Sequence, residues 1–295
     1  MKQLIGYLWK LPLASVVFVI GLTVGGALLP LLGLMPPQLP QGVDAGTIGL
    51  YFALGSLLFG LALALLAQGV SGSYVLRWFT LTLMMWVAYA VNNVIEGRIY
   101  STFAVTSSIR SMLYTGLSLL LPTLGQAAVI AALFKPPSKA LRTRERLSAF
   151  PLPGWAWRLV VALVVFPVIY FIFGLLVEPL IREYYVRGQF ELALPPLSVI
   201  IPVQLLRSAL FLLVSLPVIL RWGKSRTALI LTLGFALFVF VGGFSMVTTY
   251  WFAWQLRLFH SLEILADEMV YALVLVMLLA PDAYLGQDTR DSQDS

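Results

Sequence analysis

IIPVQLLRSALFLLVSLPVIL, residues 200–220, is a continuous apolar stretch that contains a single charged residue, Arg207. A helix needs about 20 mostly apolar residues to cross a hydrocarbon core about 30 Å thick, so the stretch predicts a membrane-spanning helix. A lone guanidinium near the middle of such a helix costs about 3 kcal/mol or more. Arg207 is therefore expected to have a buried partner, a functional role, or both.

Stretches of the same kind fill almost the whole chain. Of its 295 residues, 60% are hydrophobic and 11% are charged, which is far from the usage of soluble proteins. We predict an all-α, polytopic membrane helix bundle with about eight transmembrane helices and no room for a soluble domain. The predicted spans are residues 11–34, 48–70, 77–97, 109–134, 157–180, 196–221, 227–250 and 260–281.

Basic residues are divided unevenly between the two sets of connections. With the N-terminus in the cytoplasm, thirteen of the nineteen Lys and Arg residues fall on the cytoplasmic side, five fall on the other side, and Arg207 is buried. The positive-inside rule then predicts a multi-pass protein of the cell membrane with both termini in the cytoplasm. The basic run 135–146 is expected to contact anionic lipid headgroups. We expect no nucleic-acid partner, because no aromatic-interleaved basic fold accompanies the charge of +6.

The basic connection divides the chain into two sets of four spans. We expect a first four-helix half at 1–134, a basic cytoplasmic linker at 135–156, a second four-helix half at 157–281, and a disordered polar tail at 282–295. GYLWKLPLASVVF (6–18) parallels GWAWRLVVALVVF (154–166), and VLRW (75–78) parallels ILRW (219–222). Four spans are an even number, so two copies would share one orientation and form a parallel repeat. Chance similarity between Leu/Val-rich helices is the alternative.

Small and aromatic residues predict how the spans pack and where they end. Gly21 and Gly25 share one face of the first span, where they allow a second backbone to approach closely. Tryptophans at the predicted span ends are expected to act as interfacial anchors: Trp155, Trp157, Trp222, Trp251 and Trp254.

Carboxylates gather in one half of the predicted membrane region. Of the thirteen acidic residues, seven lie in the outer half of a span or on the outer surface: Glu96, Glu178, Glu183, Glu191, Glu263, Asp267 and Glu268. Topology alone does not require carboxylates inside the spans. Because hydrocarbon satisfies no polar group, these side chains should face one another or water.

Two helical faces carry the polar residues. His260, Glu263 and Asp267 step by three and four, so they share one face of the last span. Asn93 and Glu96 lie on a polar stripe of the third span, with Asn92 beside it. We expect Glu263 and Asp267 to point into the bundle toward Asn93 and Glu96. At comparable depth, the expected partners of Arg207 are Asp267 and Glu263, in a structural ion pair or in a charged pathway; snorkelling of Arg207 to an interface is the third reading.

Metal and cofactor chemistry has few possible ligands in this chain. It has no cysteine and one histidine, which excludes thiolate sites, three-histidine metal sites and bis-histidine haem. We expect no metal and no cofactor. The candidate substrate- or ion-binding residues are Arg207, Glu263, Asp267, His260, Glu96, Asn92 and Asn93.

Three classes of function fit these features. A permease or transporter with a polar cavity in the outer half of the bilayer is favoured. It would be ion-coupled, passive or driven by another subunit, since no nucleotide-binding motif is present. An intramembrane enzyme acting on a lipid or isoprenoid would use Glu263, Asp267 and Glu96 as acid and base, and Arg207 or Arg110 for phosphate. A non-catalytic structural or signalling subunit would use the charges for packing. A homo-oligomer or a partner membrane subunit is left open.

Overall fold

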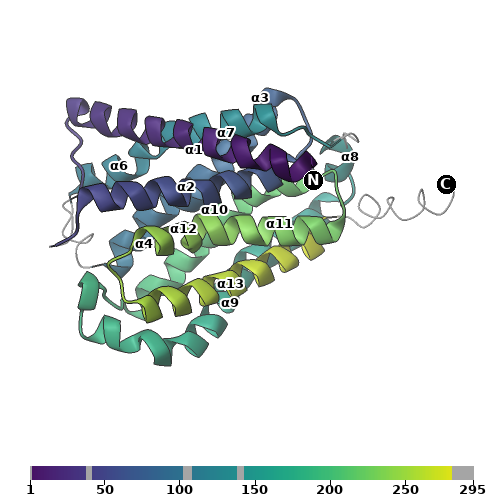
Figure 1. Ribbon diagram of the computed structural model, residues 1–295. Helices are drawn as coiled ribbons and strands as arrows, with labels where there is room; N and C mark the ends of the chain where they lie inside the picture. The colour runs from purple at the N-terminus through teal and green to yellow at the C-terminus, as the bar shows by residue number, and fades with distance from the viewer. Residues whose placement is uncertain (1, 38–41, 102–107, 138–142, 281–295) are drawn as a thin grey trace.

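The computed structural model describes residues 2–37, 42–101, 108–137 and 143–280, and within these ranges the regular structure is helical apart from two isolated bridges. Long helices run side by side along one direction (Figure 1). Seven helical segments among the described residues are long and apolar enough to cross a membrane. The predicted all-α membrane bundle is therefore confirmed as a fold class. The tail 282–295 lies outside the described residues.

The first half contains four of these seven segments. They are built from α1 (Lys2–Leu28) with η1 (Leu29–Leu32), α2 (Ala45–Ala67), α3 (Tyr74–Met85) with η2 (Trp86–Val91) and α4 (Asn92–Tyr100), and α6 (Ile109–Ser118) with α7 (Leu120–Leu133). η2 is a π-helical turn that joins α3 to α4. The fourth predicted span is thus two helices that meet at Leu119, three residues before Pro122.

The second half follows the short α8 (Thr143–Leu147) and repeats this order. Its elements are α9 (Leu152–Val186), η3 (Gln189–Glu191), α10 (Leu197–Leu220), α11 (Arg226–Phe238), η4 (Val239–Gly243), α12 (Phe244–Thr248) and α13 (Trp254–Leu279). η4 is again a π-helical turn. The helix of the fifth predicted span, 157–180, is longer than expected, at 35 residues, because it begins inside the predicted linker at Leu152 and continues to Val186.

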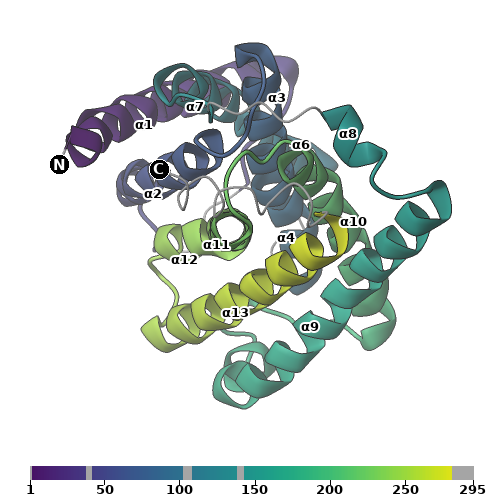
Figure 2. The ribbon, with the colours of Figure 1, turned by 90° about the vertical axis from the view of Figure 1, so that its right-hand side faces the viewer.

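α13 corresponds to the eighth predicted span. With 26 residues it is long enough to cross, but it carries Arg257, Glu263, Asp267 and Glu268 and is not among the seven apolar segments. It packs against α9 and α11, which both belong to the seven. In Figure 2, α13 and α9 lie on the side of the bundle opposite α1 and α7. The Lys2 end of α1 and the Leu279 end of α13 lie at the same end of the bundle (Figure 1).

The two halves match in element order and in spacing. α2 and α10 begin 152 residues apart, α3 and α11 also begin 152 residues apart, and both third spans contain a π-helical turn. The helix pairs also correspond, since α1 packs on α7 as α9 packs on α13. This agrees with two copies in the same orientation, although a common origin of the halves stays a prediction.

The matching turns after α2 and α10 contact each other directly. Val70 and Trp222 form an antiparallel bridge, and Gly223 N donates to Gly69 O at 2.8 Å. Ser71 N and Ser71 Oγ both donate to Arg221 O at 2.9 Å. These turns lie at the end of the bundle that also holds Lys2 and Leu279, and they join the two halves there.

The packing of α1 confirms the role expected for its glycines. A Cβ on Gly21 would lie 2.6 Å from the Cα of Pro122, and one on Gly25 would lie 3.1 Å from the carbonyl oxygen of Ser118. The outward faces of the bundle are apolar: Ile20 on α1 and Leu175 on α9 are 57% and 71% exposed. Such surfaces suit contact with lipid.

Candidate functional site

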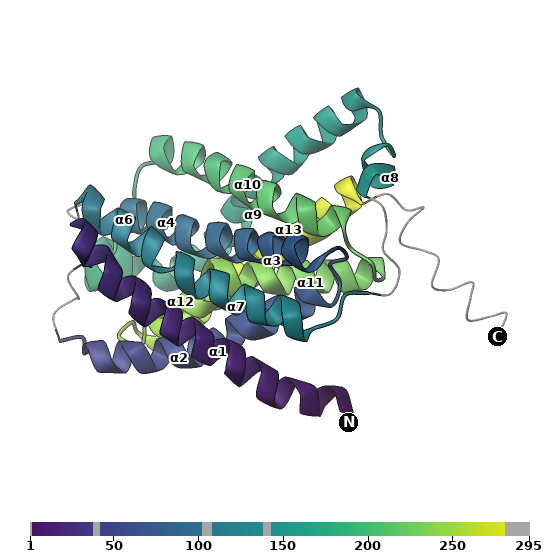
Figure 3. The same ribbon diagram turned by 90° about the horizontal axis from the view of Figure 1, so that it is seen from above.

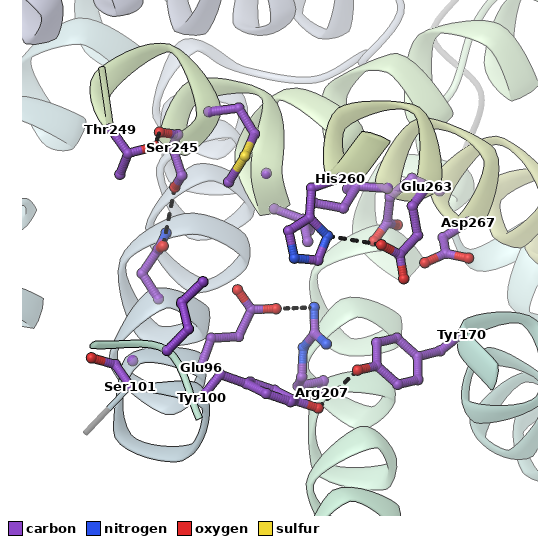
Figure 4. Close-up of a pocket in the computed structure, with 18 of the residues that line it drawn as sticks. Glu96, Tyr100, Ser101, Tyr170, Arg207, Ser245, Thr249, His260, Glu263 and Asp267 are labelled. Carbon is purple, nitrogen blue, oxygen red and sulfur yellow. Dashed lines mark hydrogen bonds and ion pairs between the residues drawn. The ribbon is translucent and has the colours of Figure 1, made fainter. Parts of the chain in front are cut away.

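A cavity of about 290 Å³ lies toward the end of the bundle at which α4 and α9 end and α13 begins. Side chains from α4, α9, α10, α12 and α13 line it (Figure 4), so both halves contribute to its wall. The volume is near the lower limit of small-molecule sites, about 300–1,000 Å³. This end lies opposite the end that holds Lys2 and Leu279.

Arg207 projects from α10 into the cavity wall and is 3% exposed. Its Nη2 lies 2.5 Å from Glu96 Oε1. Its Nε donates to Asn92 Oδ1 at 2.8 Å, and its Nη1 donates to Gln204 Oε1 at 2.8 Å. The guanidinium carbon also lies 5.5 Å from the centre of the Phe166 ring. All three guanidinium nitrogens of Arg207 are therefore engaged.

The expected pairing of Arg207 with Asp267 or Glu263 is wrong. The partners come from α4, which presents Glu96 one turn after Asn92. α10 packs against α3 and η2, directly before α4, and also against α13, but the acidic face of α13 lies across the cavity from the guanidinium (Figure 4). The position of a residue along its span predicts its depth in the membrane. It does not predict which of several helices lies beside it at that depth.

Asn92 and Asn93 have different surroundings. Asn92 is fully buried against Arg207. Asn93 lies on the cavity wall, where its Nδ2 donates to Tyr89 O at 2.8 Å and its Oδ1 accepts from Ser245 Oγ at 3.1 Å. Asn93 therefore connects α4 to α12, whereas Asn92 holds the guanidinium.

α13 supplies the remaining predicted site residues. His260 Nδ1 lies 2.8 Å from Glu263 Oε2, and its Nε2 lies 2.7 Å from the hydroxyl of Tyr185. Asp267 is 4% exposed and lines the same cavity. The sequence prediction that Glu263 and Asp267 point into the bundle, toward Asn93 and Glu96, agrees with this arrangement.

The sequence placed Glu268 among the seven carboxylates of the outer half but not among the candidate binding residues. Glu268 is 1% exposed and lines the cavity beside Asp267. Its position, about 100° around the helix from Asp267, placed it off the polar face that spacing defined. The sequence does contain a signal for Glu268, which is the presence of two adjacent acids in an apolar span. Adjacent residues lie on different faces of a helix, and a helix that packs on two sides can bury both faces.

Tyrosines were also missed. The hydroxyl groups of Tyr100 and Tyr170 are hydrogen-bonded at 2.9 Å, and Gln204 Nε2 donates to the Tyr100 hydroxyl at 3.2 Å. Tyr170, Tyr100 and Tyr185 all line the cavity. Tyrosine is common near membrane interfaces, so its presence in the sequence does not distinguish these three residues from the other tyrosines of the chain.

Carboxyl groups outnumber basic groups on the cavity wall. Glu96, Glu263, Asp267 and Glu268 face one guanidinium and one imidazole. Within the described residues, Asp267 Oδ1 and Glu268 Oε2 are buried and have no hydrogen-bond partner. Buried polar groups are nearly always paired, so two unpartnered carboxylate oxygens on a cavity wall indicate a place for a positively charged or donor group.

A metal is one kind of positive charge, but the arrangement of side chains does not favour it. Among the described residues, no group of three or more His, Asp and Glu side chains is arranged to hold a metal ion.

No protein-family model matches the sequence, and no curated protein and no solved structure matches it either. Function must therefore be argued from the cavity itself.

Proposed function

We propose that this chain is a multi-pass permease of the cell membrane whose cavity binds a small cationic solute. The two unpartnered, buried carboxylate oxygens of Asp267 and Glu268 carry the proposal. A buried charge without a partner costs several kcal/mol by order of magnitude, and a bound cation would offset that cost.

The topology of the proposal follows the basic residues of the connections. Their asymmetry favours a cytoplasmic location for the end of the bundle that holds Lys2 and Leu279. The cavity would then lie in the outer half of the membrane and take its solute from outside. Transport would be passive or ion-coupled in this chain alone.

The two alternatives receive less support. An enzyme that uses Arg207 to hold phosphate would need the positive charge of the guanidinium, but Glu96 already pairs with that charge at 2.5 Å, and Asn92 and Gln204 hold the side chain in place. A purely structural set of charges would be paired inside the protein, as Arg207 is. Asp267 Oδ1 and Glu268 Oε2 are not paired within the described residues. Arg207 therefore organises the helices, and the acids of α13 remain for a ligand.

The test is ligand-dependent stability of the purified chain in lipid nanodiscs. Tetramethylammonium, guanidinium and spermidine are compared with acetate and phosphate at matched ionic strength. A cation that binds the native state stabilises it by about 2.7 kcal/mol at 100 times its Kd, which raises the unfolding temperature. We expect stabilisation by at least one of the cations and by neither anion. Counterflow of that cation in proteoliposomes then tests transport.

Matched variants assign the effect to the cavity. Asp267→Asn should abolish the cation-dependent shift, because it removes a carboxylate from the wall. Glu183→Gln should leave the shift unchanged, because the Glu183 side chain is 76% exposed at the end of α9 and outside the cavity. Stabilisation by anions alone, or an equal cation shift in Asp267→Asn, would contradict the proposal.

A further inference from the structure

A second cavity opens between α9 and α10 on the outside of the bundle. Its volume is about 460 Å³, and its walls are the last turns of α9 and the segment around the start of α10. The two helices cross at an angle in Figure 3. Three apolar residues at this opening are strongly exposed: Leu175 (71%), Leu194 (59%) and Leu197 (61%). The exposed ion pair of Glu178 and Arg182 lines the same space, so the groove lies where the apolar part of α9 meets its polar end.

The groove and the polar cavity share part of their walls. Five residues line both spaces: Tyr100, Tyr170, Tyr185, His260 and Glu263. Gly174 also lines the groove, and a Cβ on it would lie 3.4 Å from Glu263 Oε1. The floor of the groove is thus made by the same polar side chains that border the charged cavity. The Tyr100–Tyr170 hydroxyl pair lies at this boundary.

We propose that the solute is a cationic amphiphile, of the alkylammonium class, which enters sideways from the membrane through the groove between α9 and α10. Its positive headgroup would occupy the cavity against Asp267 and Glu268, and its hydrocarbon chain would lie in the groove along Leu175 and Leu197. This inference rests on the proposed function and adds the class of substrate and its route.

Two physical arguments favour this occupant. The polar cavity is lined by four carboxyl groups and is of limited size, which suits a positive headgroup and not a whole amphiphile. The groove offers apolar walls at Leu175, Leu197 and Ile200, which suit a hydrocarbon chain. Lipid is as apolar as these walls, so the chain gains little by leaving the bilayer. The groove instead lets the chain stay in an apolar environment while the headgroup reaches the carboxylates.

The experiment measures binding of two probes to the full chain in nanodiscs, tetramethylammonium and dodecyltrimethylammonium. Membranes concentrate the long-chain probe for any protein, so the decisive comparison is between variants in the same nanodiscs. Leu175→Trp and Leu197→Trp narrow the groove from its two walls. Leu176→Trp is the matched control, because Leu176 is 67% exposed on the same helix and does not line the groove.

We expect the two groove variants to weaken binding of dodecyltrimethylammonium by about tenfold and to keep the affinity for tetramethylammonium. Leu176→Trp should change neither affinity. Equal affinity of the long-chain probe for Leu175→Trp, Leu197→Trp and Leu176→Trp would overturn the lateral route. If tetramethylammonium still binds and Asp267→Asn still abolishes that binding, the proposed function survives this failure. Binding of neither probe, together with no response to the other cations, would overturn both proposals.

Discussion

Arg207 and the acids of α13 have opposite surroundings although both are buried charges in the same half of the bundle. Arg207 has a carboxylate, two amide oxygens and aromatic faces around it. Asp267 and Glu268 each keep an oxygen without a hydrogen-bond partner in the described part of the chain. A satisfied charge stabilises one packing of the helices, whereas an unsatisfied charge raises the free energy of the empty site. The first suits organisation of the fold and the second suits ligand binding.

The ion pair between Arg207 and Glu96 should be visible in a double-mutant cycle. Arg207→Leu alone should reduce the free energy of unfolding by about 3–5 kcal/mol, because Glu96 is left without its partner charge. Arg207→Leu combined with Glu96→Leu should recover most of that loss. Denaturation of the single and double variants in detergent measures the coupling energy. Arg207→Leu combined with Asp267→Leu is the control and should recover less. Equal recovery in both pairs would mean that Glu96 is not the main partner.

Helical spacing in the sequence predicted which side chains share a face, but it did not predict all of their partners. Helical spacing put His260, Glu263 and Asp267 on one face, and the structure places them together on the cavity wall. The same reasoning assigned Arg207 to α13 instead of α4, because depth along a span carries no information about lateral neighbours. It also omitted Glu268 from the candidate residues, because Glu268 lies about 100° around the helix from Asp267 and so falls off the face that the spacing defines.

At the scale of elements, tight turns and helix ends explain residues that the sequence assigned to the membrane surface. Trp222 was expected to anchor the chain at an interface, which is wrong, because it is fully buried. It occupies the turn after α10, where it bridges Val70. Its flat ring fits there because Gly69 has no side chain, and a Cβ on Gly69 would lie 2.0 Å from a ring carbon. Position at a span end does not distinguish an exposed anchor from a packed turn.

Gly69→Ala should therefore destabilise the junction between the halves. The added methyl overlaps the buried Trp222 ring, and overpacking of this kind costs about 1–3 kcal/mol. The matched control is Gly49→Ala, because a Cβ on Gly49 in α2 meets nothing within 4 Å. That substitution should be neutral or stabilise by up to about 1 kcal/mol, since Ala is the better helix former. Thermal unfolding of both variants in the same detergent compares them. Equal losses would show that the Trp222 contact is unimportant.

Arg146 shows the same principle at the end of a helix. It belongs to the basic run that was expected to contact lipid headgroups, but it is 1% exposed, and its guanidinium donates to the carbonyl oxygens of Ile219 and Trp222. The last carbonyls of α10 need donors from elsewhere, and Arg146 supplies them. Headgroup contact by this residue is therefore wrong, while Lys139 and Arg142 lie outside the described residues.

Removal of this cap should cost more than removal of an exposed arginine. Arg146→Met should lower the free energy of unfolding by about 1–3 kcal/mol, because buried carbonyl oxygens lose their donors. Arg187→Met is the control: its ion pair with Glu183 is exposed, so the expected loss is about 0–1 kcal/mol. Chemical denaturation of the two variants provides the comparison. A smaller loss for Arg146→Met than for Arg187→Met would contradict the capping role.

On the scale of the whole molecule, the sequence predicted the architecture better than it predicted details inside the spans. Apolar length identifies helices that cross a membrane, since the bilayer fixes the number of residues required. Composition does not reveal a π-helical turn, and neither η2 nor η4 was foreseen.

The two turns occur at matching positions of the two halves, in addition to the matching sequence segments. Yet the cavity with the acids occurs beside α13, whereas the corresponding packing of α1 on α7 is closed by Gly21 against Pro122. The two halves thus differ in their interiors although their element order is the same.

The membrane orientation can be tested with two cysteines in a chain that has no native cysteine. Ser138 and Gln41, which would be natural labelling sites from the sequence, lie outside the described residues. Ser148 and Gln189 are exposed and flank α9, a helix of 35 residues or about 52 Å at 1.5 Å per residue. In intact cells, a membrane-impermeant maleimide should label Gln189→Cys, and Ser148→Cys should react only after the membrane is permeabilised. The physical reason is the excess of basic residues on the side of Ser148, which resists translocation.

Labelling of Ser148→Cys alone from outside would reverse the orientation and place the cavity toward the cytoplasm. Labelling of both from outside would mean that α9 does not cross the membrane.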